Sequence, residues 1–226
     1  MSEHGIDPVA SQTEPSEGAT PTATYSLFAT FRVSSSHPVV LDGRDVPGFV
    51  RELEDVSLEL ADEGVSVRGW YDVSGVRSDA DLLVWLQGGA PEDLQWSLRQ
   101  LRRSALVQPL IRSWSALGVA VDSVPTGTAS DASASTASTL APKQWLSVCG
   151  VAERPSFVDE VSGAPSVTTQ VIAACGVGEA DWLVAREADE LSWIVDHLRD
   201  AGGNRDRLGV IAGRLVDPAE IVEVLQ

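Results

Sequence analysis

The stretch ADLLVWLQGGAPEDLQWSLRQLRR (residues 80–103) is matched later in the chain by ADWLVAREADELSWIVDHLRD (residues 180–200). Each stretch begins with an apolar strand, continues through a short polar turn, and ends in a helix that opens with two carboxylates. The spacing predicts that each helix buries a Leu, a Trp and a second Leu. Strand and helix units repeated at this distance predict a duplicated α+β fold, whose function must be sought where the two copies differ.

The rest of the chain extends this pattern to a strand–helix–strand–strand–helix–strand order in each half. The predicted strands are 25–33, 65–73, 81–86 and the end of 107–121, then 144–149, 167–174, 181–185 and 209–215. The predicted helices are 46–63, 92–103 and 187–201, with a short remnant at 154–161. Two ferredoxin-like units packed sheet to sheet predict a dimeric α+β barrel within one chain.

Two low-complexity segments set the domain boundaries. Residues 1–23 contain too few large apolar residues to offset the entropy of ordering, so we predict a disordered acidic and polar tail. The tract 123–142 is rich in Ser, Thr and Ala, which is typical of a flexible linker. The two expected repeats are therefore 24–122 and 143–226.

Composition excludes several classes of partner. The 226 residues carry a formal net charge of −17, and such an acidic chain repels nucleic acid and anionic membrane surfaces. The chain has neither a signal peptide nor an apolar stretch of the roughly 20 residues that span a bilayer. Two cysteines are too few for a disulfide scaffold. We expect a cytoplasmic protein.

Three motifs then resemble one known family. The segment 67–85 resembles the chlorite dismutase family, and within it the actinobacterial coproheme decarboxylases. The pattern at 187–196 and the segment 114–118 are similar to that family in matching order. The resemblance implies two ferredoxin-like repeats, an oligomer that is often pentameric, and a haem or coproheme pocket in the second repeat. In the decarboxylases, an oxidoreductase class, hydrogen peroxide oxidises the iron and a tyrosyl radical drives loss of two propionate carboxyls.

The residues that the family uses for chemistry are replaced here. Cys149 aligns with the reactive Tyr, and Glu153 aligns with the Arg that binds a propionate; Arg154 lies one residue later. The histidine that holds the iron should follow on a helix, but no His occurs between His37 and His197. The Ser, Thr and Ala tract takes the place of a linker that contributes a distal His in the actinobacterial enzymes. A carboxylate facing a substrate carboxylate is repulsive in a pocket of low dielectric.

The remaining candidates each have a structural explanation beside the functional one. Cys149 is either a thiolate ligand of the haem iron or a small packing residue. His197 is either an iron ligand or a surface residue, and a ligand would need placement in the pocket and a supporting partner. Cys175 could form a disulfide with Cys149 only in an oxidising compartment. We expect Tyr71 to serve packing and Arg77 to serve an ion pair or turn.

Other enzyme signatures are missing from the sequence. It contains no phosphate-binding glycine loop, no nucleophile elbow and no metal-binding spacing. The histidines His4 and His37 lie in the predicted tail and in a loop, without expected chemistry. The carboxylate pairs 92–93 and 189–190 are explained by their place at predicted helix starts, where they stabilise the helix dipole.

The favoured hypothesis is a diverged, non-catalytic paralogue, a pseudoenzyme that acts as a subunit or regulator. It would form a homo-oligomer, a pentamer by resemblance, or a mixed oligomer with an active family member, and tetrapyrrole binding is doubtful. The alternative is an active peroxide-dependent coproheme decarboxylase or a weak haem peroxidase that uses an unusual ligand. A third hypothesis is a barrel that binds another small ligand. A second-half pocket filled by Trp145, Phe157 and Trp182 would argue against a tetrapyrrole.

Overall fold

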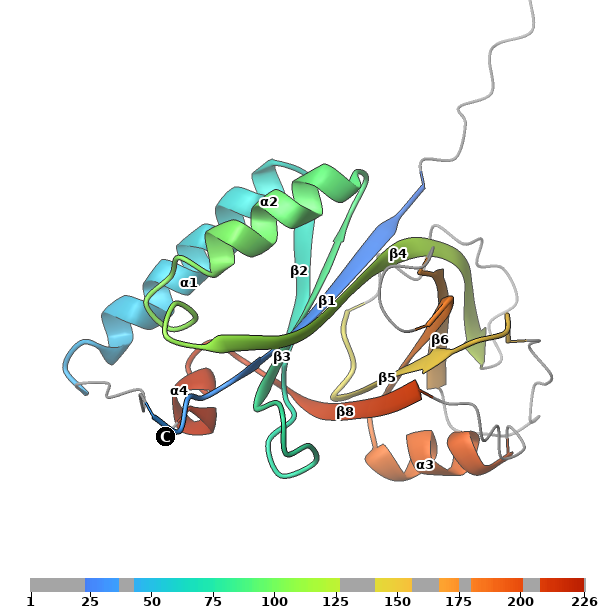
Figure 1. The fold of residues 1–226 in the computed structure, drawn as a ribbon. Helices are drawn as coiled ribbons and strands as arrows, with labels where there is room; N and C mark the ends of the chain where they lie inside the picture. Colours follow the sequence, from blue (N-terminus) through green and yellow to red (C-terminus); the bar gives the residue numbers. More distant parts are fainter. Residues whose placement is uncertain are drawn as a thin grey trace, which may run out of the picture.

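The computed structural model describes residues 23–36, 43–126, 141–155, 167–174, 180–200 and 208–225 (Figure 1). The first half contains β1 (Tyr25–Arg32), α1 (Val46–Asp62), β2 (Val65–Asp72), β3 (Leu82–Gly88), α2 (Pro91–Leu101) and β4 (Ile111–Thr126). The second half contains β5 (Trp145–Val151), β6 (Val167–Ala173), β7 (Trp182–Ala188), α3 (Leu191–Asp200), β8 (Leu208–Val216) and α4 (Ile221–Val224). The predicted α+β class is confirmed.

The strands form one closed antiparallel barrel in the order β1-β3-β2-β8-β5-β7-β6-β4. The first half contributes the neighbours β4-β1-β3-β2, and the second half contributes β8-β5-β7-β6, which is the same order. The halves join where β2 pairs with β8 and where β4 pairs with β6. Closure leaves no free sheet edge, since each described strand has two neighbours.

Glycine allows the backbones to approach closely at both joins. A Cβ on Gly118 of β4 would collide with the carbonyl oxygen of Ala173 in β6. A Cβ on Gly213 of β8 would lie 2.7 Å from the carbonyl oxygen of Asp72 in β2. Because a backbone oxygen cannot move aside as a side chain can, both positions favour glycine.

Side chains on the barrel strands alternate between an interior core and an outer face. The interior core includes Phe28, Trp85, Val148 and Leu183. On the outer face of the first half, α1 and α2 lie side by side and bury Leu53 and other apolar residues against the sheet (Figure 1). The helix α3 lies on the other side of the barrel and packs on the second half. No helix among the described residues is long and apolar enough to cross a membrane.

Three details of the predicted elements were wrong. Glu187 and Ala188 belong to β7, and the helix expected at 187–201 begins at Leu191, because Glu187 is paired in the sheet with both Leu146 and Thr168. The carboxylates 189–190 therefore precede that helix. Trp96, expected in the core, is 38% exposed. It lies two positions from the buried Leu94, which turns it to the opposite face of a 3.6-residue helix.

Other predictions meet the described residues only in part. The strand β4 continues to Thr126, into the segment 123–142 that we predicted as linker. Residues 127–140 of the predicted linker lie outside the described residues. The same holds for most of the predicted tail and for most of the remnant helix predicted at 154–161. The short helix α4 was not predicted. Its Ile221 and Val222 are buried in the same core as Val216, so tertiary packing accounts for it.

Candidate functional site

The predicted site lies on the outer face of the second half's sheet. Leu146 and Val148 of β5 point into the barrel, so the residues between and after them, Ser147 and Cys149, point outward. Pairing places Ser147 beside Arg186 of β7, and Arg186 beside Thr169 of β6. This row of two hydroxyls and a guanidinium crosses three strands. Cys149 lies one row further along the sheet.

Both hydroxyls in that row are buried. Ser147 is 0% exposed and Thr169 is 4% exposed, and the Oγ of the first and Oγ1 of the second have no hydrogen-bond partner among the described residues. Buried polar groups in folded proteins are usually bonded, so an unmet pair on one face is uncommon. The row therefore keeps hydrogen-bonding capacity toward whatever covers this face.

Cys149 is a packed residue. It is 1% exposed and clusters with Val151, Val184 and the partly buried Trp182. Its Sγ donates to the backbone oxygen of Val184 at 3.8 Å and accepts from Nη1 of Arg186 at 3.7 Å. The sulfur is thus engaged with the protein on both sides.

The residues after β5 point away from a buried pocket. Glu153 and Arg154 are both exposed. The guanidinium of Arg154 lies over the ring of Trp182, 5.5 Å from its centroid, in cation–π geometry. Because Trp182 also packs against Cys149, the structure brings Arg154 and Cys149 to the same tryptophan. Glu153 is not part of that group.

The histidine candidate lies on α3. His197 is half-buried, and the helix contacts the sheet through Trp193, Ile194 and Leu198, which pack with Trp145, Val167 and Ala188. Among the described residues, no three His, Cys, Asp or Glu side chains are grouped so that they could hold a metal ion. His37, Phe157 and Cys175 lie outside the described residues.

Among the described residues, this donor set does not fit a haem iron. The sequence has no histidine from residue 38 to residue 196, His197 lies on α3, and the sulfur of Cys149 is buried. An iron ligand must direct a lone pair toward an open coordination position. Cys149 instead faces a carbonyl and a guanidinium. Trp145 and Trp182 are partly buried and pack against apolar clusters.

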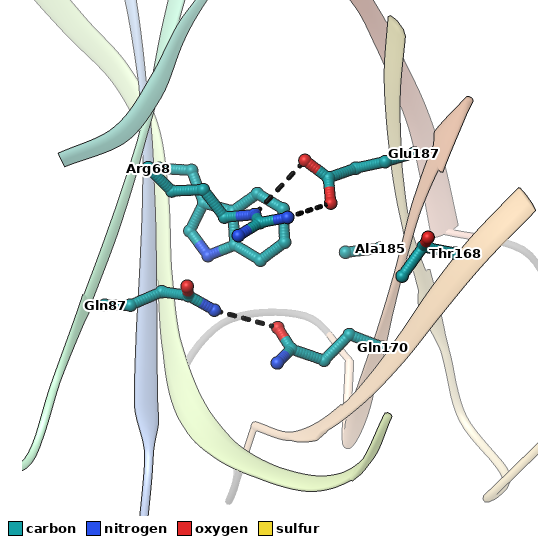
Figure 2. Close-up of a pocket in the computed structure, with 7 residues that line it drawn as sticks. Arg68, Gln87, Thr168, Gln170, Ala185 and Glu187 are labelled. Carbon is teal, nitrogen blue, oxygen red and sulfur yellow. Dashed lines mark hydrogen bonds and ion pairs between the residues drawn. The ribbon is translucent and has the colours of Figure 1, made fainter. Parts of the chain in front are cut away.

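A second polar group, which sequence reasoning missed, lies inside the barrel. Arg68 of β2 forms a bidentate pair with Glu187 of β7, with Nε–Oε1 and Nη2–Oε2 distances of 3.1 and 2.5 Å. The two side chains point toward one another from opposite halves (Figure 2). They are 5% and 3% exposed. The Arg68 guanidinium also lies 4.9 Å from the ring centroid of Trp85.

Glutamine side chains form a second link between the halves. Gln87 donates from Nε2 to Oε1 of Gln170 at 3.3 Å (Figure 2). Ser26 donates to the same oxygen at 3.3 Å. The space left among these side chains measures about 10 Å³, which is near the minimum for one water molecule. The described side chains around this space therefore form a packed joint.

Burial also fixes the protonation of Tyr71. Its hydroxyl donates to Oε1 of Glu187 at 3.3 Å. Desolvation, and then the negative charge of Glu187, raise the pKa of Tyr71 well above its ordinary value of 10.0, although the nearby Arg68 opposes this. Tyr71 thus stays a hydrogen-bond donor. The expected packing role is accompanied by a polar one.

The repeat in the sequence held a signal for this joint. Positions one hundred apart line the same small cavity: Trp85 matches Ala185, and Gln87 matches Glu187. One copy contributes a large ring to this cavity where the other contributes a small side chain. The differences between the copies thus make the halves complementary.

Arg77 forms the ion pair that was expected. Its Nε and Nη2 donate to the two carboxylate oxygens of Asp79, each at 2.6 Å. The hydrogen bond from Arg77 lowers the pKa of Asp79. The pair is solvent-exposed and lies in the connection between β2 and β3, away from both polar groups.

Comparison with known proteins explains the fold. Residues 47–151 match the family model described as chlorite dismutase. The chain is 28% identical over 193 residues to the coproheme decarboxylase of Mycolicibacterium smegmatis, covering 79% of this chain and 81% of that protein. Both comparisons show that the chain is similar to the chlorite dismutase family.

Solved structures of the family have the same fold. The imidazole complex of chlorite dismutase from Candidatus Nitrospira defluvii superposes with a TM-score of 0.65 at 16% identity, covering 92% of this chain and 97% of that one. A single-residue variant of that enzyme gives 0.64 at 18% identity, with coverage of 90% and 95%.

Proposed function

We propose that this chain is a diverged member of the haem-biosynthesis branch of the chlorite dismutase family that does not perform the family's reaction and acts as a non-catalytic subunit or regulator. One observation carries the proposal: the residue at the reactive tyrosine position, Cys149, is 1% exposed and engaged by Arg186 and Val184. Packed in this way, the thiol does not lie open to a substrate that it would oxidise.

The two halves are ferredoxin-like repeats, and together they form a dimeric α+β barrel in one chain. The support is that both halves have the same strand order, β4-β1-β3-β2 and β8-β5-β7-β6. The second repeat would be the degenerate haem-site half, because the residues at its predicted site are packed.

A subunit needs a surface for its partner. Large apolar side chains are exposed on both helices of the first half: Leu58 of α1 is 67% exposed and Trp96 of α2 is 38% exposed. Exposed apolar groups on a rigid helical layer suit a subunit contact. We propose a homo-oligomer, such as a pentamer, or a mixed ring with an active family member in the cytoplasm.

The first experiment is a coproheme titration of the purified full chain, followed through the Soret band. We expect no saturable stoichiometric complex. A tight complex with one coproheme per chain would contradict the proposal and favour the alternative, an active decarboxylase or weak peroxidase with an unusual ligand.

The variant Cys149→Ala separates those outcomes. If a complex forms and the variant loses the iron spectrum, Cys149 is a thiolate ligand and the alternative holds. Cys149→Ser is the matched control, because it keeps the size of the side chain and removes the sulfur. Native mass spectrometry of the protein from its own host then reports bound ligands and partner subunits, and a lone chain carrying neither would contradict a subunit role.

A further inference from the structure

The outer face of β4 lies beyond the cover of the helices. The helix α1 packs on β2, and α2 packs mainly on β3 and β1. Because β4 is the next strand after β1, a groove of about 380 Å³ opens between α2 and β4. Ligand sites in proteins typically enclose about 300–1,000 Å³, so the groove is large enough for a small molecule.

The groove has an apolar floor and a cationic rim. Leu27 of β1, Leu98 of α2 and Leu117 of β4 contribute the apolar side chains. Three arginines line it as well: Arg99 and Arg102 at the end of α2, and Arg112 of β4. No carboxylate belongs to the described lining.

These arginines differ from the paired arginines of the chain. Arg68, Arg77 and Arg214 each form an ion pair with a carboxylate. By contrast, the side chains of the three groove arginines make no hydrogen bond or ion pair within the described part of the chain. The chain has 33 acidic and only 16 basic side chains. Three guanidinium groups without a described carboxylate partner around one groove are therefore unexpected for its composition.

Helix electrostatics explain only part of this arrangement. A cation in the last turn stabilises a helix through its dipole, which accounts for Arg99 and to a lesser degree for Arg102. Arg112 lies on a strand and gains nothing from that dipole. Its convergence with the other two on the same leucine-lined groove needs another reason.

We propose that this groove binds a small amphipathic organic anion, with its apolar body on the leucines and a carboxylate or phosphate group held by Arg99, Arg102 and Arg112. Guanidinium groups bind both anions through paired N–H donors. The apolar floor removes water from one side of the contact, which strengthens it. The site lies in the first half and stands whether or not the second half binds a tetrapyrrole.

The experiment compares two fluorescent probes on the full chain. Anilinonaphthalene sulfonate carries an anionic group on an aromatic body, and phenylnaphthylamine has the same rings without the charge. We expect saturable binding of one sulfonate probe per chain, with affinity at least about tenfold higher than for the neutral probe. Equal affinity for both probes, or no saturable binding, would overturn the proposal.

Three variants locate the site. Arg102→Gln combined with Arg112→Gln should weaken sulfonate binding by about tenfold or more. Gln95→Trp places a bulky ring in the groove from an exposed position and should weaken both probes. Arg103→Gln is the matched control, because Arg103 is exposed, bonds Gln100 and is not part of the lining.

Each further outcome decides the question. If Arg103→Gln weakens binding as much as the double variant, the effect is one of net charge and the proposal fails. If the double variant leaves probe affinity unchanged and alters the oligomeric state in light scattering, the groove is a protein interface and the small-anion proposal fails. Competition by dodecanoate and by dodecyl phosphate then distinguishes the two anionic groups.

Discussion

The outer face of the first half is covered by α1 and α2, which bury large apolar side chains such as Leu53 and Leu94. The outer face of the second half carries smaller and polar residues at its predicted site, among them Ser147, Cys149 and Thr169. Both halves nevertheless have the same strand order. The two halves therefore share the arrangement of their strands but differ in the residues on their outer faces.

The interior of the barrel differs from both outer faces, because neither half builds it alone. Arg68 and Gln87 come from the first half, and Glu187 and Gln170 come from the second. A buried charge that loses its partner is destabilising, whereas a lost exposed contact costs little. Variants of the interior joint should therefore lose more stability than variants of exposed contacts.

The largest loss of stability should come from Glu187→Ala. It leaves the Arg68 guanidinium, which is 5% exposed, without its carboxylate. We expect the free energy of unfolding to fall by about 3–5 kcal/mol in urea denaturation. The double variant Arg68→Met with Glu187→Leu should recover most of that loss, because it removes both charges. A single-variant loss below about 1 kcal/mol would mean that the pair is not buried in solution.

Leu94 and Leu191 occupy matching positions on α2 and α3, and truncating the more buried of the two should cost more stability. Leu94→Ala on α2 truncates a side chain that is 0% exposed, and we expect a loss of about 2–5 kcal/mol. Leu191→Ala on α3 truncates the half-buried counterpart and should cost less than half as much. Thermal and urea unfolding measure both. Equal losses would show that the second half is packed as tightly as the first.

The join between β4 and β6 should tolerate no added methyl group. Gly118→Ala sets a Cβ against the carbonyl oxygen of Ala173, so we expect a loss of about 1–3 kcal/mol. The control is Gly48→Ala in α1, where no atom lies within 4 Å of the added Cβ. That change should be neutral or stabilising by up to about 1 kcal/mol. An unchanged Gly118→Ala protein would contradict the close approach of the halves.

The smallest effect at neutral pH should come from Tyr71→Phe, which removes one hydrogen bond to Glu187 and should cost about 1 kcal/mol. The raised pKa of Tyr71 adds a dependence on alkaline pH. Its stabilising effect is complete below the unfolded value of about 10 and declines as the pH rises above it, because only the unfolded chain then releases the proton.

Urea unfolding at a series of alkaline pH values tests this dependence. The wild-type protein should lose stability faster than Tyr71→Phe above about pH 10. Parallel curves for the two proteins would indicate that Tyr71 ionises in the folded state as it does in the unfolded chain.

Sequence periodicity found most of the frame, since apolar alternation and helical spacing depend on local burial. It misplaced the start of α3, because Glu187 is a polar residue that the barrel retains in a strand through its pairing with Arg68. It also placed Trp96 in the core, where helix geometry turns it outward. The first error concerns a contact that no single segment specifies, whereas the second concerns which face of α2 is buried.

The position of the candidate site stays a prediction, whereas its packing could be described only from the structure. Alignment with the family pointed to Cys149, and its outward direction on β5 follows from strand alternation. The engagement of its sulfur by Arg186 could not be predicted, because it depends on the register between β5 and β7. The arginine groove was missed because its lining comes from β1, α2 and β4, whose side chains meet only in the folded barrel.

The proposed function requires that this chain does not decarboxylate coproheme. The most direct test incubates the purified full chain with coproheme and hydrogen peroxide and measures the mass of the tetrapyrrole afterwards. The account predicts that the propionate carboxyls are retained, even at equimolar protein. Stepwise loss of two carboxyl groups as carbon dioxide, dependent on the folded protein, would contradict it.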